Sequence, residues 1–153
     1  MSYEIRVKEV PDHLVASVRR RVSMVTIGKE TPEAFHELAD AVATVGFGPG
    51  MPGVEYLGDV GPDTEWEMEI FMPVEAPFET PEGMRVKILP GGTFASTIHH
   101  GPYAECGAAY DALRSWIATN ERTIVGPPRE LYLNDPKDVA QEDALTEILF
   151  PIG

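Results

Sequence analysis

The chain has 153 residues, of which 43% are hydrophobic, so it can bury a single core without disulfides or a structural metal. It carries 25 Asp and Glu residues against 12 Lys and Arg, which gives a formal net charge of -13. Such a surface repels nucleic acid, because nucleic-acid binding relies on Lys and Arg to neutralise phosphates. We therefore expect one domain that does not bind nucleic acid directly and whose charge suits a neutral or cationic partner.

Cysteine content and hydropathy restrict the class further. Cys106 is the only cysteine, so an intramolecular disulfide and a Cys-based zinc site are both excluded. The first residues lack the apolar stretch of a signal peptide, and no apolar run is long enough to span a bilayer. We expect a cytoplasmic protein with no membrane partner, no metal and no cofactor.

The chain opens with two β-rich runs, residues 3–10 and 13–22, which are separated by Pro11 and Asp12. Proline cannot donate to the ladder of a central strand, and the Pro-Asp pair favours a turn or bend. The two runs therefore form either one broken strand or two strands.

The first predicted helix begins at Pro32, with Thr31 as its N-cap, and ends at Gly46. Its apolar residues follow helical spacing and form one stripe: Phe35, Leu38, Ala39, Val42 and Val45. The residues after this helix are rich in Gly and Pro and predict a loop over 47–53. Strands are expected next at 54–60 and 64–72.

The second half of the chain follows the same order of elements. Strands are expected at 84–90, 93–100, 130–134 and 143–150. Gly91 and Gly92 favour a tight hairpin between the first two of these strands. The second helix is expected to start near Pro102 and to end near Asn120.

The two halves also share short sequence matches in the same order. Val7–Pro11 recurs as Val86–Pro90, and Glu69–Val74 corresponds to Glu147–Ile152. The order of strand and helix periodicities is the same in each half, which predicts a duplicated βαββ unit. We expect one α+β domain over residues 1–153, with repeats at about 3–75 and 84–153 and a linker at about 76–83.

Glu147 is the leading candidate for a functional side chain. Alternation along the last strand places it on the same face as Leu145 and Leu149. An unpaired charge among apolar neighbours costs several kcal/mol, so this carboxylate needs a partner, a proton or a ligand. Two structural alternatives stay open at this stage: pairing with an Arg of the protein, and simple exposure to solvent.

Glu69 is the counterpart of Glu147 in the first half. It lies in a strand where three acids alternate with three apolar residues, Glu65 to Ile70. We interpret this pattern as an ordinary strand face in contact with solvent. Only Glu147 is therefore expected to be a buried carboxylate.

Aromatic residues could wall a pocket around Glu147 and hold a cation by cation–π attraction. Tyr103 at a helix start and Tyr132 on a strand are the better candidates, followed by Tyr56 and Trp66. Tyr110 and Trp116 lie on or near the helix stripe and are expected in the core.

Two other patterns carry less weight. His99 and His100 are neighbours on a strand, so they point to opposite faces and cannot bind one metal ion together. Arg19, Arg20 and Arg21 form the only basic run, which we interpret mainly as surface charge, with one Arg as a candidate for the cleft.

Three segments together resemble a known family: Thr97–Tyr103, Glu130–Pro136 and Leu145–Ile152. The chain is similar to the GyrI-like superfamily of small-molecule-binding domains, which includes effector-binding domains of AraC-type and MerR-type multidrug regulators. The resemblance implies two βαββ units around a pseudo-two-fold axis, an antiparallel sheet with helices on one side and a ligand cleft between the repeats. It also implies that Glu147 contacts cationic ligands and that Tyr103 and Tyr132 belong to aromatic motifs.

These expectations favour a stand-alone protein that senses or sequesters a hydrophobic, cationic, drug-like compound, with no nucleic-acid contact of its own. One alternative is a hydrolase of cyclopropane-bearing or similar electrophilic compounds, using Glu147 with Tyr103 or Tyr132. Another is a protein partner, either a separate regulator or a DNA topoisomerase, that meets the acidic surface.

Overall fold

The computed structural model describes residues 3–58, 60–135 and 138–153, which form two compact units. The terminal unit comprises Met1–Val10 together with Gly92–Gly153, and the central unit comprises Pro11–Gly91. Two residues of the segments named above, Asp59 and Pro136, lie outside the described residues.

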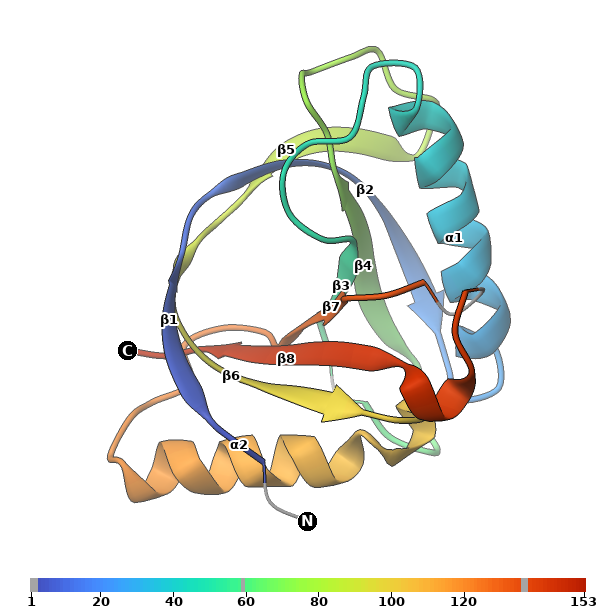
Figure 1. The fold of residues 1–153 in the computed structure, drawn as a ribbon. Helices are drawn as coiled ribbons and strands as arrows, with labels where there is room; N and C mark the ends of the chain where they lie inside the picture. The colour runs from blue at the N-terminus through green and yellow to red at the C-terminus, as the bar shows by residue number, and fades with distance from the viewer. Residues whose placement is uncertain (1–2, 59, 136–137) are drawn as a thin grey trace. The chain divides into compact units, whose positions relative to one another are not determined.

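The central unit is a four-stranded antiparallel sheet with one helix. Its elements are β2 (His13–Val22), α1 (Ile27–Val42), β3 (Gly53–Tyr56), β4 (Trp66–Pro73) and β5 (Met84–Leu89). The strand order is β3-β4-β2-β5, and α1 packs against β2 and β4 (Figure 1). The predicted linker, residues 76–83, contains no helix or strand.

The terminal unit has a sheet of the same size. Its elements are β1 (Arg6–Val10), β6 (Gly92–His100), the 3-10 turn η1 (Tyr103–Glu105), α2 (Gly107–Thr119), β7 (Arg129–Tyr132), the 3-10 turn η2 (Gln141–Asp143) and β8 (Leu145–Pro151). The strand order is β1-β6-β8-β7, again antiparallel, and α2 packs against β6 and β8 (Figure 1). Both units are therefore α+β, as the periodicities predict.

The predicted hairpin at Gly91 and Gly92 is wrong. Strand β5 pairs with β2 of the central unit, whereas β6 pairs with β1 and β8 of the terminal unit. A Gly-Gly pair favours a hairpin only when its flanking strands pair with each other, and here each strand has partners elsewhere. The two opening runs are likewise two separate strands, because β1 and β2 lie in different units.

The chain passes from one unit to the other twice, after Val10 and after Gly91. A hydrogen bond within the central unit joins the residues next to these two points. The backbone N–H of Gly91 donates to Asp12 Oδ1 at 2.7 Å, beside two prolines, Pro11 and Pro90, that have no N–H to offer a ladder. Strands β1 and β5 thus each end at a proline, and the chain enters the other unit close to it.

Helix α1 begins five residues before the predicted start. Ser23 and Thr26 form a turn that runs directly into the helix, since the N–H of Ile27 donates to the Ser23 carbonyl at 2.9 Å. Pro32 consequently lies inside α1 rather than at its first position. The helix ends at Val42, earlier than predicted, and a turn continues to Gly46, which has a φ of 112° and donates to the Val42 carbonyl at 2.8 Å. Of the helices in the described ranges, none is long and apolar enough to cross a bilayer.

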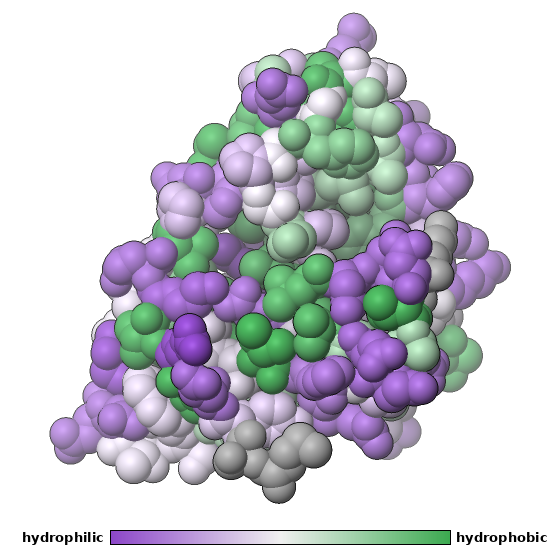
Figure 2. Space-filling view, viewed as in Figure 1, coloured by the Kyte–Doolittle hydropathy of each residue, from purple (hydrophilic) through white to green (hydrophobic). Residues whose placement is uncertain are grey.

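Each sheet buries the face that its helix covers. In the terminal unit, buried residues of α2 meet buried residues of β6 and β8, namely Ala109, Leu113, Ile117, Ala95, Ile148 and Phe150. In the central unit, Ala34, Leu38 and Val42 of α1 are fully buried. Some hydrophobic side chains stay exposed among hydrophilic ones on the surface (Figure 2). The opposite face of each sheet also buries apolar residues, among them Phe71 and Leu149, and it carries buried polar groups beside them.

The packing of α2 gives a stability prediction. Leu113→Ala removes a fully buried side chain and should lower the free energy of unfolding by about 2–5 kcal/mol, measured by urea denaturation. Val125→Ala, at a side chain that is 62% exposed, should change it by less than about 0.5 kcal/mol. Equal losses in the two variants would contradict the helix-side core.

Candidate functional site

Glu147 lies on the face of the terminal-unit sheet that α2 does not cover. Its neighbours in β8, Thr146 and Ile148, point toward the helix, so Glu147 points the other way. Directly across the ladder are Ile98 of β6 and Leu131 of β7. The carboxylate is therefore flanked by apolar side chains on both neighbouring strands, and Glu147 is only 7% exposed.

The partner of Glu147 is a lysine from the edge of the same sheet. Lys8 Nζ of β1 reaches over β6 and donates to Glu147 Oε2 at 2.7 Å. Within the described residues, Lys8 is the only side chain that donates to this carboxylate. The Lys8 side chain is 43% exposed against 9% for Glu147, so the ammonium sits where water can also reach it. A lysine thus takes the place of the arginine that one alternative expected.

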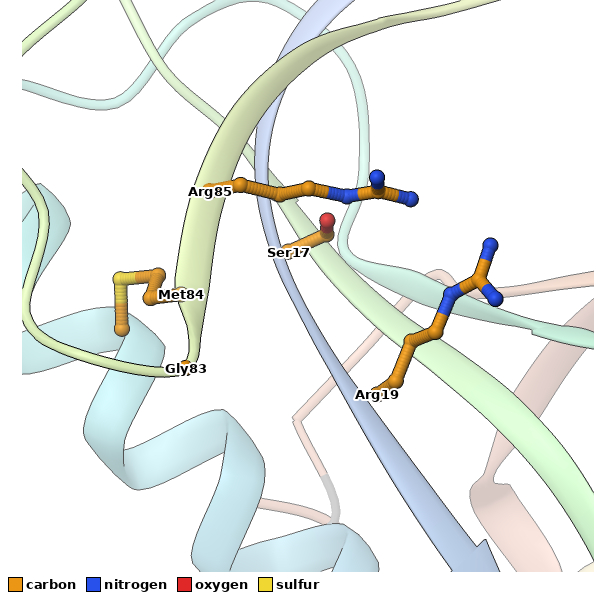
Figure 3. A pocket seen from close by; sticks show the side chains of 5 residues that line it. All are labelled: Ser17, Arg19, Gly83, Met84 and Arg85. Atoms are coloured by element: carbon orange, nitrogen blue, oxygen red, sulfur yellow. The ribbon is translucent and has the colours of Figure 1, made fainter.

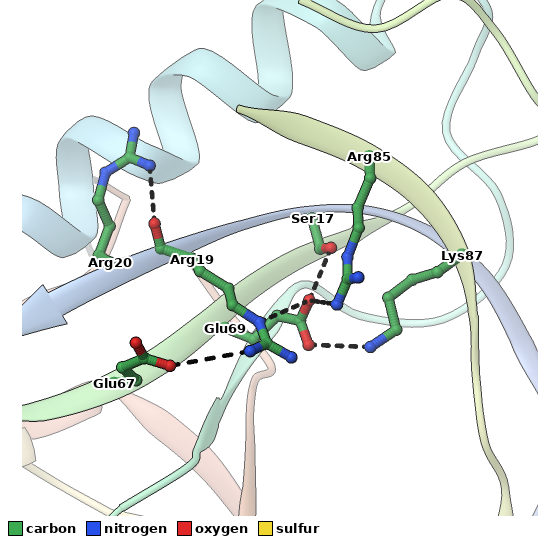
Figure 4. Close-up of polar contacts among 7 residues, drawn as sticks. All are labelled: Ser17, Arg19, Arg20, Glu67, Glu69, Arg85 and Lys87. Carbon is green, nitrogen blue, oxygen red and sulfur yellow. Dashed lines mark hydrogen bonds and ion pairs between the residues drawn. The ribbon is translucent and has the colours of Figure 1, made fainter. Parts of the chain in front are cut away.

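Glu69 contradicts its sequence interpretation. It is 2% exposed, and three side chains donate to it: Lys87 Nζ at 2.9 Å, Arg85 Nη2 at 3.1 Å and Ser17 Oγ at 2.9 Å (Figure 4). Lys87 and Arg85 come from β5 and reach over β2 to β4. The strand pattern alone missed this burial, because the covering side chains come from a strand that is not adjacent to β4.

The electrostatics of Glu69 follow from these contacts. Burial alone would raise the pKa of the Glu69 carboxyl, but hydrogen bonds from Lys87, Arg85 and Ser17 outweigh burial, and the pKa is lowered. Glu69 is therefore an ionised carboxylate whose hydrogen-bonding capacity is largely used within the protein.

The two carboxylates differ in how completely they are held. Glu69 accepts from three side chains, whereas Glu147 accepts from Lys8 alone within the described residues. Arg6 precedes Lys8 in β1 as Arg85 precedes Lys87 in β5, yet Arg6 turns to the exposed Glu4, at 2.9 Å between Nη2 and Oε1. Glu147 consequently keeps acceptor capacity for a further donor or cation.

Tyr103 and Tyr132 lie together, but not beside Glu147. Their rings pack edge to face with centroids 5.5 Å apart and an interplanar angle of 83°. Tyr132 is the cross-strand partner of Thr146, so it points to the α2 side of the sheet, opposite Glu147. Tyr103 also lines a hollow of about 150 Å³ with Pro102, Val139, Ala140, Gln141 and Ala144.

Glu130 is a buried carboxylate that the sequence analysis missed. It is 7% exposed and accepts hydrogen bonds from Tyr132, at 3.0 Å, and from Tyr110 of α2. Strand alternation could have predicted this burial, because it places Glu130 and Tyr132 on the sheet face that packs against the helix stripe containing Tyr110. Burial and then the nearby Cys106, Glu130 and Asp135 raise the pKa of the Tyr103 hydroxyl, so Tyr103 is a neutral hydrogen-bond donor at physiological pH.

The remaining aromatic candidates belong to the central unit. Trp66 is 2% exposed on the α1 side of β4 and forms part of the core. Tyr56 pairs with Met68, which receives a contact from Thr31 of α1, so Tyr56 also points to the helix side. Neither ring shares a sheet face with Glu69.

The two histidines separate as strand alternation requires. His99 is buried, with Nδ1 at 3.0 Å from the Tyr3 hydroxyl and Nε2 at 3.0 Å from the Pro102 carbonyl oxygen, whereas His100 is exposed. No group of three or more His, Cys, Asp or Glu side chains in the described ranges is placed to hold a metal ion.

Each α+β unit thus carries a buried carboxylate on the sheet face opposite its helix. The chain belongs to the GyrI-like family: the model of the GyrI-like small molecule binding domain matches residues 3–153. The resemblance seen in the sequence is therefore confirmed. None of the curated proteins matches the chain in sequence.

Solved structures show the same fold. The C-terminal domain of EcmrR is 24% identical with a TM-score of 0.89, and the match covers 100% of this chain and 99% of that chain. A hydrolase from Listeria innocua is 15% identical with a TM-score of 0.71, covering 98% of this chain and 92% of that chain. SAV2435, solved bound to tetraphenylphosphonium, is 15% identical with a TM-score of 0.64, covering 100% of this chain and 94% of that chain.

The contacts of Glu69 predict a pH effect. Its lowered pKa means that Glu69 stabilises the fold above the unfolded carboxyl pKa of about 4.3, and this stability is lost as pH falls through the lower folded value. Glu69→Gln should therefore flatten the loss of stability between pH 7 and pH 3, measured by urea denaturation. Glu33→Gln, at an exposed position, should keep the wild-type slope. An unchanged dependence of stability on pH in Glu69→Gln would contradict a lowered pKa of Glu69.

Proposed function

We propose that this domain binds hydrophobic cationic small molecules against Glu147, as a sensing or sequestering protein. The observation that carries the proposal is a buried carboxylate, on an apolar and helix-free sheet face, held by one half-exposed lysine. Family membership supports binding of a small molecule, and the tetraphenylphosphonium bound to SAV2435 supports a lipophilic cation as its type.

Lys8 has the role of a built-in counter-ion in this proposal. A buried carboxylate with no partner would destabilise the fold by several kcal/mol, so a cation must be present in the absence of ligand. The ligand cation takes the place of the Lys8 ammonium at 2.7 Å from Glu147 Oε2. Because Lys8 is already 43% exposed, its ammonium returns to water at small desolvation cost.

Apolar contact would supply the rest of the affinity. Ile98, directly across the ladder from Glu147, is 50% exposed, and Leu131 on the other side is partly exposed. Covering half of an isoleucine side chain contributes roughly 1 kcal/mol, and a delocalised cation loses little hydration on approach. A lipophilic cation therefore suits this face better than a small hydrated ammonium.

The aromatic residues take different roles in this proposal. Tyr103 is 39% exposed at the 150 Å³ hollow, apart from Glu147, and we propose that its ring makes a separate ligand contact there. Tyr132 orients Tyr103 through their edge-to-face contact. Tyr56 and Trp66 point to the helix side of the central unit and support its packing.

Binding is better supported than hydrolysis. A general base and a general acid must both reach the reacting group, and Glu147 and Tyr132 point to opposite faces of the sheet. One oxygen of Glu147 is also already engaged by the Lys8 ammonium. The likeness to a Listeria hydrolase extends to the fold alone.

We also propose that residues 3–75 and 84–153 are two copies of one βαββ unit within a single domain. The strand orders β5-β2-β4-β3 and β1-β6-β8-β7 correspond when the sequence repeat is applied. In both units a lysine from the first strand of one repeat reaches the glutamate of the other repeat, Lys8 to Glu147 and Lys87 to Glu69. A pseudo-two-fold arrangement of the copies is part of this proposal.

Calorimetric titration with tetraphenylphosphonium tests the function. Glu147→Gln removes the charge but keeps the shape, so the affinity should fall at least about tenfold, the size of a charge-assisted contact. Glu33→Gln makes the same change at an exposed position of α1 and should leave the affinity unchanged. Equal affinities in the wild type and Glu147→Gln would rule out this carboxylate as the cation contact.

The proposed role of Lys8 predicts an increase in affinity when this residue is replaced. Lys8→Gln removes the internal competitor, so tetraphenylphosphonium should bind about three- to tenfold more tightly in the same titration. Lys29→Gln removes one charge from an exposed position of α1 and controls for net charge. Weaker binding in Lys8→Gln would indicate that Lys8 shapes the site instead of occupying it.

A further inference from the structure

A second, chemically different site is present in the central unit. A hollow of about 470 Å³ is lined by Ser17 and Arg19 of β2 and by Gly83, Met84 and Arg85 at the start of β5 (Figure 3). The two arginine side chains and the Ser17 hydroxyl extend to the same side of the strands in this view. None of these five residues is acidic.

The accessible charge at this hollow is positive. Arg19 and Arg85 have side chains that are 53% and 55% exposed, whereas Glu69 behind them is 2% exposed. Glu55, the cross-strand neighbour of Glu69 on β3, is buried as well, at 8%. Glu67, 3.7 Å from Arg19, has a side chain that is 49% exposed, so an entering molecule meets two guanidinium groups and one carboxylate, a net positive charge.

The guanidinium groups also keep hydrogen-bonding capacity. Arg85 donates from Nη2 to Glu69 at 3.1 Å, which uses one of its five N–H groups (Figure 4). Arg19 lies 3.9 Å from Glu69 and 3.7 Å from Glu67, which are ion-pair distances longer than hydrogen bonds. Both arginines can consequently turn N–H groups toward a molecule in the hollow without losing a strong contact.

Glu69 explains why the cations stay in place. Without a counter-ion, Arg85, Lys87 and Arg19 would repel one another, since all three converge on the same stretch of β4. The buried carboxylate neutralises part of this charge and fixes the two β5 side chains over β2. It thereby pre-organises the arginines and leaves their outer N–H groups exposed.

We propose that this hollow binds the carboxylate of a small organic acid between Arg19 and Arg85. The planar guanidinium fork matches a carboxylate in a bidentate geometry, and 470 Å³ is enough space for a small molecule that carries one. Gly83, with a φ of 84° and no atom within 4 Å of where a Cβ would lie, leaves the rim open for the rest of the ligand. The site lies in the other unit from Glu147 and has the opposite charge preference.

Binding of benzoate to the full chain tests this proposal, followed by calorimetry and by amide chemical shifts in two-dimensional NMR. Benzoate should bind saturably and shift the amides of Ser17, Arg19 and Arg85. Arg19→Gln and Arg85→Gln should each weaken binding about tenfold, as expected for the loss of a charge-assisted contact. Arg6→Gln, a 69% exposed arginine of the terminal unit, should bind benzoate as the wild type does.

A variant that is expected to bind benzoate more tightly distinguishes the loss of a ligand contact from damage to the fold. Glu67→Gln removes a half-exposed negative charge 3.7 Å from Arg19, leaves Glu69 and its contacts in place, and should tighten benzoate binding about threefold. A collapse of the site would weaken it. Glu147→Gln should have no effect on benzoate, so failure here and failure of the cation site are distinguishable.

Three results would overturn the proposal: no saturable benzoate binding, equal affinity in Arg19→Gln and the wild type, or weaker binding in Glu67→Gln. Inorganic phosphate is the remaining probe. If phosphate binds as tightly as benzoate with the same dependence on Arg19, the assignment to a carboxylate is wrong.

Discussion

Alternation of side chains along β4 and β8 is the constraint on which the rest of the structure depends. One set of alternate residues packs against a helix, so the other set must occupy a face with no helix. Glu69 and Glu147 both fall in this second set, and a long cation from the edge strand reaches each of them. The two buried carboxylates therefore lie on the opposite side of each sheet from the residues that pack against its helix.

The elements and the family could be predicted from the sequence because both depend on local patterns. Apolar periodicity placed every strand to within a few residues, and three segments together, including the one around Glu147, identified the GyrI-like family. Strand pairing could not be predicted in the same way. The partner of β5 is β2, and nothing in the Gly91-Gly92 turn reveals that the preferred partner lies far away in the chain.

The candidate site was predictable in part for the same reason. Burial of Glu147 followed from the apolar residues beside it in its own strand, whereas burial of Glu69 depends on side chains that arrive from a strand two positions away. The tyrosines show a related limit: motif analysis grouped Tyr132 with Glu147, but their faces are decided by register. A shift of one residue in register decides whether a side chain lies on the face of Glu147 or packs on the helix side.

The exchange of β1 and β5 between the units has a consequence for the integrity of the molecule. A cut in the segment 76–83 would divide the chain into two fragments, and each fragment would keep an edge strand that pairs with strands of the other. Each would also carry away the lysine that neutralises the other's buried carboxylate. Neither fragment is a self-sufficient folding unit, so a protease that nicks this segment would leave two pieces that remain bound to each other by their own hydrogen-bonded strands.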